Sequence, residues 1–342
     1  MKTINLRATS GTSKIYTGES LKNLSKYADP GRTFIITDPD VNKLFGDRFS
    51  DYKIIEIRKG EENKTLEAVE NIYKKLLDCE ADRGSNIVGI GGGIVCDITG
   101  FVASTYMRGV KFGFVPTTLL SQVDAATGGK NGVNLDRYKN IIGVINQADF
   151  VICDTHTLTT LPDKEFNCGL SEVVKSAAIG DSLFFEFLEN NISGIIKRDP
   201  LLLEKVVHDS LKVKVGIVER DEKESGERRK LNFGHTIAHA LERATGITHG
   251  DAVSAGMVVA ADFSVKRKLL PVEIAGRLKE LLSSLNLPLT MDAEKEYIKD
   301  AVRKDKKREG EDINFVFLKG IGEAVIEKIS VNHMEEIIDD MH

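Results

Sequence analysis

Residues 231–242 read LNFGHTIAHALE and place His235 and His239 four positions apart in a predicted helix. Side chains at i and i+4 share one face of an α-helix, so both imidazoles lie on the same side. The spacing is that of the zinc-protease motif H-E-x-x-H, but Thr236 stands where that motif has its general-base glutamate. From spacing alone, the pair is a metal site, a proton relay or two ordinary helix histidines.

A third histidine, His249, follows His235 by 14 residues and begins the next predicted helix. Histidines on successive helices converge if the helices pack antiparallel, and a carboxylate would complete a His₂Glu metal set with an open coordination position. The stretch GLSEVVK (169–175) carries Glu172 and Lys175 at i and i+3, a spacing most often found in surface ion pairs. Spacing does not identify the carboxylate that would join the histidines.

The glycine turn GIGGGIVCD (89–97) follows an apolar strand and opens a predicted helix. Backbone N–H groups at such a helix N-terminus bind phosphate well. The dinucleotide fingerprint G-x-G-x-x-G is matched at Gly89 and Gly91 only, because Ile94 takes the third glycine position. No acidic residue follows at the usual distance of about 20 positions. The turn therefore predicts a phosphate site, with a tight turn that binds nothing as the alternative.

A second glycine group, VDAATGGKNGVN (123–134), presents Lys130 and is followed by Lys139 and Asn140. It lacks the phosphate-loop pattern G-x-x-x-x-G-K-[ST], because Asp124 replaces the first glycine and Asn131 follows the lysine. A glycine loop with one ammonium group suits a phosphate. A flexible surface loop is the alternative interpretation.

The spacing of apolar residues along the chain changes near residue 155. Before it, apolar runs alternate with a helical period, which predicts an α/β domain with a mostly parallel sheet. The predicted strands are 34–37, 52–57, 86–90, 112–117 and 150–154, with helices at 65–82 and from about 94. After it, the pattern predicts mainly helices, at 163–180, 182–190, 200–220, 231–245, 250–268 and 271–285, and then strands at 313–318 and 323–329. Asn232 would lie one turn before His235 on the same helical face.

Composition narrows the class of protein. The 342 residues carry a net charge of −5, which argues against a nucleic-acid-binding protein. Four scattered cysteines indicate reduced thiols, and no stretch resembles a signal peptide or a membrane span. We therefore expect a soluble cytoplasmic protein of two domains.

Taken together, these segments resemble the 3-dehydroquinate synthase family of sugar-phosphate cyclases. The resemblance covers about residues 60–310 and runs through GGGIVCD, TYMRGVKF, VPTTLLSQVDAATGGKNGVN, KNIIG, TLPDKEFNCGLSEVVK, DEKESGERRKLNFGHTIAHALE, HGDAVSAGM and DKKREG. It implies a Rossmann-like NAD-binding domain over 1–155 and a mainly α-helical, metal- and substrate-binding domain over 156–342.

The same resemblance implies the site residues. Glu172, His235 and His249 would hold the metal, Zn²⁺ or Co²⁺. NAD⁺ would be held by the glycine turn and by polar residues of nearby loops, namely Glu61, Lys64, Gly92, Gly93, Asp97, Thr117, Thr118, Asp124, Lys130 and Lys139. The substrate phosphate would be surrounded by Lys130, Asn140, His239 and Lys306 (chosen over its neighbour Lys307), with Arg108 from a neighbouring subunit. The substrate carboxylate would be held by Lys214 and Arg228 beside Asn232, and Lys175 and Glu224 would complete the polar shell.

The implied reaction is the lyase step of the shikimate pathway, in aromatic amino acid biosynthesis. NAD⁺ and metal would convert 3-deoxy-D-arabino-heptulosonate 7-phosphate to 3-dehydroquinate with loss of phosphate, and NAD⁺ would be regenerated in each turnover. A homodimer is expected, with no nucleic-acid or membrane partner.

Three other functions fit part of the pattern. Cyclases making 2-deoxy-scyllo-inosose or a valiolone act on substrates without a carboxylate. A glycerol or alcohol dehydrogenase would leave the basic substrate residues without a role, and a non-catalytic nucleotide-binding protein would make the metal residues incidental. The basic and amide set Lys214, Arg228, Asn232 and Lys306 favours the dehydroquinate substrate.

Overall fold

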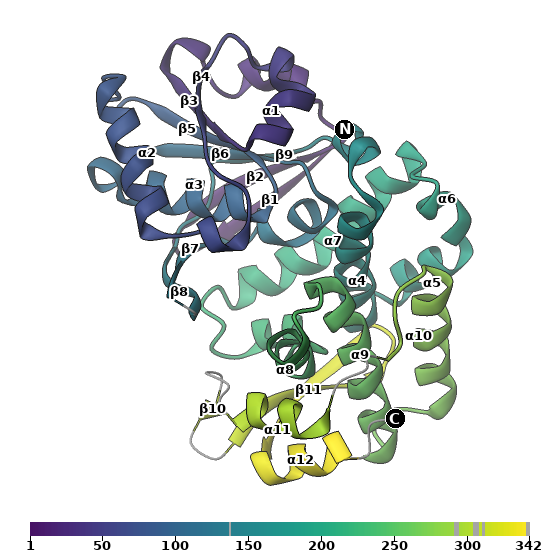
Figure 1. Cartoon of the computed structure of the whole chain (residues 1–342). Helices are drawn as coiled ribbons and strands as arrows, with labels where there is room; N and C mark the ends of the chain where they lie inside the picture. Colours follow the sequence, from purple (N-terminus) through teal and green to yellow (C-terminus); the bar gives the residue numbers. More distant parts are fainter. Residues whose placement is uncertain (137, 291–293, 304–307, 310–311, 340–342) are drawn as a thin grey trace. The chain divides into compact units, whose positions relative to one another are not determined.

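The computed structural model describes residues 1–136, 138–290, 294–303, 308–309 and 312–339. The chain forms two compact units, Met1–Leu161 with Leu203–Glu222, and Pro162–Leu202 with Lys223–His342 (Figure 1). A single division at 155 assigns residues 203–222 to the second part. In the structure this segment belongs to the first unit, where Glu222 accepts hydrogen bonds from Ser10 and Gln147.

The first unit is built on a seven-stranded sheet with strand order β1-β2-β9-β6-β5-β3-β4. Only the β1–β2 pair is antiparallel, and the other five pairings are parallel. The predicted Rossmann-like fold with a mostly parallel sheet is therefore confirmed. The strands are β1 (Lys2–Ala8), β2 (Gly11–Thr17), β3 (Thr33–Thr37), β4 (Lys53–Glu56), β5 (Asn86–Gly91), β6 (Lys111–Pro116) and β9 (Phe150–Cys153).

Helices of the first unit follow the predicted pattern. In α2, the buried residues Val69, Ile72 and Leu76 recur at helical spacing, and the Thr65 side chain accepts the Ala68 N–H at the N-terminus. The glycine turn opens α3, which packs against β5 and β6. The helices are α1 (Pro39–Phe45), α2 (Leu66–Asp78), α3 (Gly93–Thr105) and most of α7 (Pro200–Arg220), with short turns η1 (Leu21–Lys26), η2 (Pro30–Arg32), η3 (Gly46–Arg48), η4 (Glu61–Asn63), η5 (Tyr106–Arg108), η6 (Ser121–Ala125) and η7 (Thr155–Thr160).

Two hairpins escaped prediction. The first is β1–β2, which begins the chain, and the second is β7 (Lys130–Leu135) with β8 (Tyr138–Ile145), a separate two-stranded sheet. Both lack a long apolar run, and β8 has no buried residue. In β7 the buried residues 131–134 include only one apolar side chain larger than glycine, Val133, so the strand leaves only a weak hydrophobic period in the sequence.

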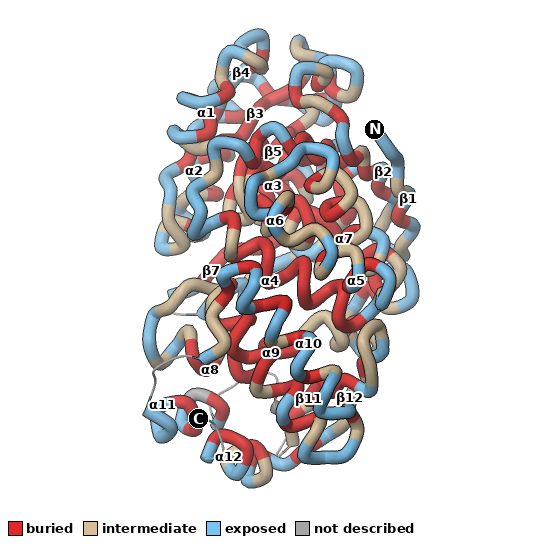
Figure 2. The backbone as a smooth tube through the Cα atoms, turned by 90° about the vertical axis from the view of Figure 1, so that its right-hand side faces the viewer, coloured by how far each residue is buried: buried red, intermediate tan, exposed pale blue. Residues whose placement is uncertain are grey.

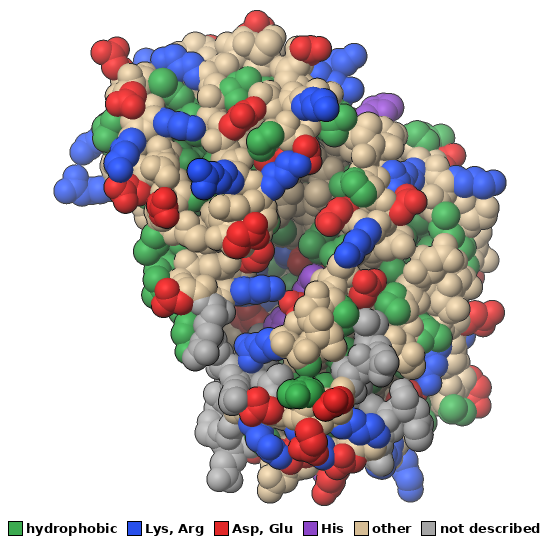
Figure 3. All heavy atoms as spheres, viewed as in Figure 1, with side chains coloured by type: hydrophobic (Ala, Val, Ile, Leu, Met, Phe, Trp, Pro, Cys, Tyr) green, Lys and Arg blue, Asp and Glu red, His purple; other side chains and the backbone are tan. Residues whose placement is uncertain are grey.

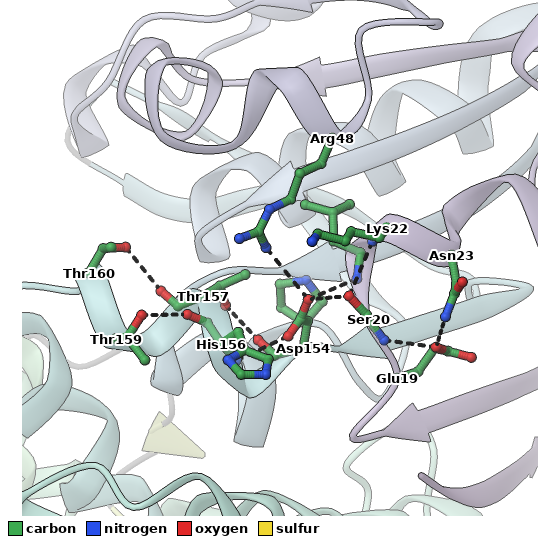
Figure 4. Close-up of polar contacts among 12 residues, drawn as sticks. Glu19, Ser20, Lys22, Asn23, Arg48, Asp154, His156, Thr157, Thr159 and Thr160 are labelled. Carbon is green, nitrogen blue, oxygen red and sulfur yellow. Dashed lines mark hydrogen bonds and ion pairs between the residues drawn. The ribbon is translucent and has the colours of Figure 1, made fainter.

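A polar cluster fixes the carboxyl end of β9. The buried Asp154 carboxylate accepts hydrogen bonds from the backbone N–H of Leu21 at 2.8 Å and of His156 at 3.0 Å, and from Ser20 Oγ at 3.3 Å (Figure 4). The buried Gln122 amide donates to the Asp154 carbonyl at 3.0 Å, which ties η6 to the same edge of the sheet.

The second unit is mainly helical, as predicted, and also contains the antiparallel sheet β10-β11-β12. Most residues of α4 and α9 are buried, whereas α10 and α12 bury one face (Figure 2). The elements are α4 (Asp163–Gly180), α5 (Ser182–Asn190), α6 (Ile192–Ile196), the start of α7, η8 (Glu227–Asn232), α8 (His235–Thr245), α9 (His249–Lys266), α10 (Val272–Ser284), α11 (Lys295–Arg303), β10 (Arg308–Glu309), β11 (Asp312–Gly320), β12 (Glu323–Ser330) and α12 (Val331–Asp339).

The predicted helix 231–245 is wrong at its start. The helix α8 begins at His235, because Gly234 before it has the left-handed φ of 77°. Asn232 belongs to η8 and therefore does not share the α8 face with His235 and His239, contrary to the prediction.

Among the described residues, none of the helices combines the length and the apolar character needed to cross a membrane. Acidic and basic side chains alternate over the face drawn in Figure 3, with no large area of one sign.

Candidate functional site

Three side chains of the second unit converge on one point. Glu172 lies in α4, His235 is the first residue of α8, and His249 is the first residue of α9. The Oε1 atom of Glu172 lies 3.4 Å from His235 Nε2 and 3.3 Å from His249 Nε2. The three potential ligand atoms lie within 4.8 Å of one another. One carboxylate and two imidazoles are the donor set of many catalytic zinc sites, so these residues fit a divalent metal.

Glycines let the three helices approach closely enough for this convergence. A Cβ on Gly250, next to His249, would lie 2.2 Å from the Cα of Cys168 in α4. A Cβ on Gly256 of α9 would lie 2.2 Å from the carbonyl oxygen of Gly234, next to His235. Real Cβ atoms do not approach other atoms so closely, so these helix contacts require glycine.

The cluster holds its charge in a buried setting. Lys175 Nζ pairs with Glu172 Oε2, and both side chains are nearly fully buried, so the alternative of a surface ion pair is wrong. Burial raises the pKa of Glu172, but the Lys175 and His235 charges outweigh this effect and hold the pKa well below its usual range. The carboxyl group is therefore ionised and acts only as an acceptor.

The two histidines differ in electrostatic setting. Burial lowers the pKa of His235, and the Lys175 cation lowers it further. Burial also lowers the pKa of His249, but hydrogen bonds with Glu172 and Glu242 outweigh burial and raise it to about 9. A bound cation would compete with the proton at these nitrogens.

Each of these two histidines has a second contact through Nδ1. His235 Nδ1 lies 3.2 Å from the carbonyl oxygen of Phe233, and His249 Nδ1 lies 2.7 Å from Glu242 Oε1. Sequence reasoning missed Glu242, although it stands two helical turns after His235 on the same face. His239, one turn along, has its ring 5.5 Å from that of His235 and perpendicular to it.

The charged loop before α8 brings together some of the predicted substrate residues. Asn232 Nδ2 donates to Glu224 Oε1, and Arg228 is buried in η8. Glu224 has a φ of 62°, which is uncommon for a residue with a side chain and marks a tight turn. Lys306 and its neighbour Lys307 lie outside the described residues.

The first unit presents the glycine turn at the carboxyl edge of its sheet. Gly92 is the N-cap of α3 and provides no side chain to bond the first N–H groups of the helix. The backbone N–H of Thr117 donates to the Gly91 carbonyl at 2.9 Å, which joins the ends of β5 and β6. A Cβ on Gly92 would lie 3.2 Å from Thr118 Cγ2. Helix amides beside bare glycine backbone fit a dinucleotide phosphate.

A polar network flanks this turn. The buried Lys64 ammonium contacts Asp97 Oδ2 and Asn140 Oδ1. The Asn134 side chain accepts the backbone N–H of Asn140 at 2.8 Å and donates to Glu61 Oε1 at 2.8 Å. One network therefore contains four predicted residues, namely Glu61, Lys64, Asp97 and Asn140. Burial raises the pKa of Asp97 to about 6, against the opposing effect of the Lys64 cation.

A second charged pair joins η6 to α7. Lys214 of α7 donates to the carbonyl oxygen of Asp124 at 2.6 Å and pairs with its carboxylate. Gly93 lies next to η6 as well, since a Cβ there would lie 3.3 Å from Ala125 Cβ. Lys214 was predicted from the second half of the sequence, but it belongs to the first unit.

The β7–β8 hairpin and η5 carry further predicted residues. Lys130 begins β7, while Lys139 and Asn140 lie near the start of β8, at the opposite end of the hairpin. Four residues of strand separate the two ends by about 13 Å. Arg108 is exposed in η5, in a left-handed turn with a φ of 71°.

Asp38 is an acidic residue at the carboxyl edge of the sheet that sequence reasoning missed. It follows β3, which lies beside β5 in the sheet, and its carboxylate accepts the N–H groups of Asp40 and Val41 at the start of α1. The dinucleotide fingerprint places the acidic partner downstream of the glycine turn, whereas the sheet topology places the upstream strand β3 next to β5.

Sequence comparison identifies the chain by family. Residues 54–168 match the 3-dehydroquinate synthase N-terminal domain, and residues 169–308 match the 3-dehydroquinate synthase C-terminal domain. A 3-dehydroquinate synthase of Dehalococcoides mccartyi is 39% identical over 358 aligned residues that cover 100% of both chains. One of Coxiella burnetii is 40% identical and covers 95% of this chain and 96% of its own.

Solved structures agree with the fold. A 2-deoxy-scyllo-inosose synthase complexed with carbaglucose-6-phosphate, NAD⁺ and Co²⁺ has a TM-score of 0.89, 26% identity and full coverage of both chains. A 2-epi-5-epi-valiolone synthase of Streptomyces hygroscopicus with NAD⁺ and Zn²⁺ has a TM-score of 0.86 at 24% identity, covering 99% of this chain and 98% of its own. From its residues, its fold and both domain matches, the chain belongs to the 3-dehydroquinate synthase family.

Proposed function

We propose that the chain is a carbon–oxygen lyase that converts 3-deoxy-D-arabino-heptulosonate 7-phosphate to 3-dehydroquinate with loss of phosphate. The observation that carries the proposal is the meeting of Glu172 Oε1 with the Nε2 atoms of His235 and His249. The 39–40% identity to 3-dehydroquinate synthases over essentially the whole chain supports the choice of reaction. The step belongs to the shikimate pathway of aromatic amino acid biosynthesis.

Zn²⁺ or Co²⁺ would be held by Glu172, His235 and His249. A divalent metal in such a site acts as a Lewis acid that lowers the pKa of bound substrate hydroxyls and polarises a carbonyl. Lys175 Nζ pairs with Glu172 Oε2, which leaves the other carboxylate oxygen facing the two imidazoles.

NAD⁺ would be held in the first unit. The N-terminal amides of α3, from Gly93 onward, would bind the pyrophosphate, and Thr117 and Thr118 at the end of β6 would border it. The Lys64, Asp97 and Glu61 network would hold the adenosine part. NAD⁺ supplies reversible hydride acceptance, so that the substrate is oxidised, loses phosphate and is reduced again without net redox change.

The remaining cations would bind the two anionic groups of the substrate. The Arg228 guanidinium suits a bidentate contact with a carboxylate, while Lys130, Lys306 and His239 suit the phosphate as point charges or single donors. Lys214 would assist at the carboxylate, with its position fixed by Asp124. Asn140, Asn232, Lys139 and Glu224 would complete the polar surroundings.

We also propose that the active form is a homodimer. The β7–β8 hairpin exposes Leu135, Tyr138, Ile141 and Ile145, each with more than a third of its surface accessible. A second copy would cover these apolar side chains, and the exposed Arg108 is available to reach a neighbouring site. Light scattering should therefore give a mass near twice 37.7 kDa. We place the protein in the cytoplasm, because its three buried cysteines are free thiols.

Phosphate release tests the proposed reaction. The purified enzyme with catalytic NAD⁺ and Zn²⁺ is assayed with the heptulosonate 7-phosphate, and in parallel with glucose 6-phosphate, which lacks the carboxylate. We expect release with the first substrate only, at many turnovers per NAD⁺ and without NADH accumulation. Release from glucose 6-phosphate would favour an inosose-type cyclase, and stoichiometric NADH would favour a dehydrogenase.

A further inference from the structure

The second contact of His249 differs in kind from that of His235. At His235, Nδ1 meets a neutral backbone carbonyl, that of Phe233, at 3.2 Å. At His249, Nδ1 meets the carboxylate of Glu242 at the shorter distance of 2.7 Å. The Nε2 atoms of both rings face Glu172. The Nδ1 partner therefore determines which nitrogen carries the proton and which is open toward the cluster.

Glu242 is well placed to hold the His249 ring. Its side chain is only 14% exposed, and it lies in α8, the helix that also supplies His235. His249 begins α9 three positions after the left-handed Gly246 that caps the end of α8, and the Thr248 side chain caps α9. The orienting group and the ring thus sit on two rigid elements joined by a short turn, which limits rotation of the imidazole.

Local helix energetics do not explain Glu242. It stands in the last turn of α8, where the negative end of the helix dipole disfavours a carboxylate. Its backbone carbonyl accepts the Gly246 N–H and would do so with any side chain. A residue placed against its local preference and paired with a potential metal ligand indicates a functional reason.

We propose that Glu242 is a positioning residue for His249, holding Nδ1–H so that Nε2 is presented to the metal and made more basic. The inference rests on the proposed metal site formed by Glu172, His235 and His249. Replacing a carboxylate that hydrogen-bonds a metal-binding histidine commonly lowers metal affinity 10–100-fold.

Direct metal binding tests this role. The dissociation constant of Zn²⁺ is measured for the metal-free protein by competition with a chromogenic chelator, and the visible spectrum of the Co²⁺ form reports ligand geometry. Glu242→Ala should bind Zn²⁺ roughly 10–100-fold more weakly and alter the Co²⁺ bands. Glu242→Gln, whose amide oxygen still accepts the Nδ1–H bond, should lie between Glu242→Ala and the wild type.

The matched controls are Glu280→Ala and Glu280→Gln, because Glu280 is an exposed glutamate on α10 of the same unit. Both should bind Zn²⁺ as the wild type does. Wild-type affinity in Glu242→Ala and Glu242→Gln would overturn the role of Glu242, while loss of binding in His235→Ala in the same assay would leave the metal site standing. A wild-type protein that binds no Zn²⁺ would overturn the metal site and the inference together.

Discussion

The two units build their sites in different ways. In the first unit, the proposed nucleotide site consists mostly of backbone at the carboxyl ends of parallel strands, and the topology of the sheet brings Gly92, Thr117 and Thr118 together. In the second unit, the proposed metal site consists of side chains from three helices, and it exists only where α4, α8 and α9 touch through glycines. A backbone site tolerates changes in side chains, whereas a convergent site depends on helix spacing to a fraction of an ångström.

Metal removal should separate the two sites most completely. Dialysis against a chelator is expected to abolish turnover, because Glu172, His235 and His249 would lose the Lewis acid that they hold. Binding of NAD⁺, measured by calorimetry, should persist if the proposed nucleotide site is independent of the metal. Added Zn²⁺ or Co²⁺ should restore activity. Full activity of the chelated enzyme would contradict the metal assignment.

Helix spacing in the second unit is tested by Gly250→Ala. The added methyl group would lie 2.2 Å from the Cα of Cys168, so α4 and α9 must move apart. We expect a loss of about 3 kcal/mol in unfolding free energy, together with weaker Zn²⁺ binding. Chemical denaturation and metal titration measure both effects.

Gly276→Ala is the control for that change. Gly276 lies within α10 and has no atom within 4 Å of the added Cβ, so alanine should stabilise by up to about 1 kcal/mol. Equal stability losses at the two positions would show that helix approach at Gly250 is unimportant.

Asp97 offers a test by pH on the nucleotide side. Its folded pKa of about 6 lies above its usual 3.8, so the folded chain binds a proton more tightly than the unfolded chain. The stability contribution of this group is therefore greatest at low pH and falls as pH rises from about 4 to about 6. It amounts to at most about 3 kcal/mol.

Comparison with Asp97→Asn isolates that effect. The unfolding free energy of the wild type relative to the variant should fall between pH 4 and pH 6 and stay level from pH 6 to pH 8. The titration of Glu172, His235 and His249 should cancel in this difference, since the wild type and Asp97→Asn both contain these residues. A difference that is flat from pH 4 to pH 6 would contradict the raised pKa.

Arg228→Ala should weaken substrate binding. Loss of a charge-assisted contact with a carboxylate costs about 1.5–3 kcal/mol, which corresponds to a KM for the heptulosonate about 10–100-fold higher. The affinity for NAD⁺ should remain that of the wild type. Steady-state kinetics with varied substrate measures the effect, and an unchanged KM would remove Arg228 from the carboxylate site.

Patterns in the sequence predicted the individual helices and most of the strands. The apolar run before GIGGGIVCD predicted β5 and α3, and helical periods located α4, α7 and α9 to within a few residues. Strands and helices depend on contacts within a few positions of each residue, so the spacing of apolar residues predicts them. Spacing also placed His235 and His239 on one face and Glu172 beside Lys175.

Tertiary structure alone decided which of these elements meet. Periodicity fixes the face that a helix buries but not its partner, so it did not show that Glu172 joins His235 and His249, or that α7 carries Lys214 to Asp124 in the first unit. Periodicity also missed the break at Gly234. This residue is left-handed and lies against α9, but the apolar residues on either side of it keep a helical spacing. These contacts join residues far apart in the chain, and packing determines them.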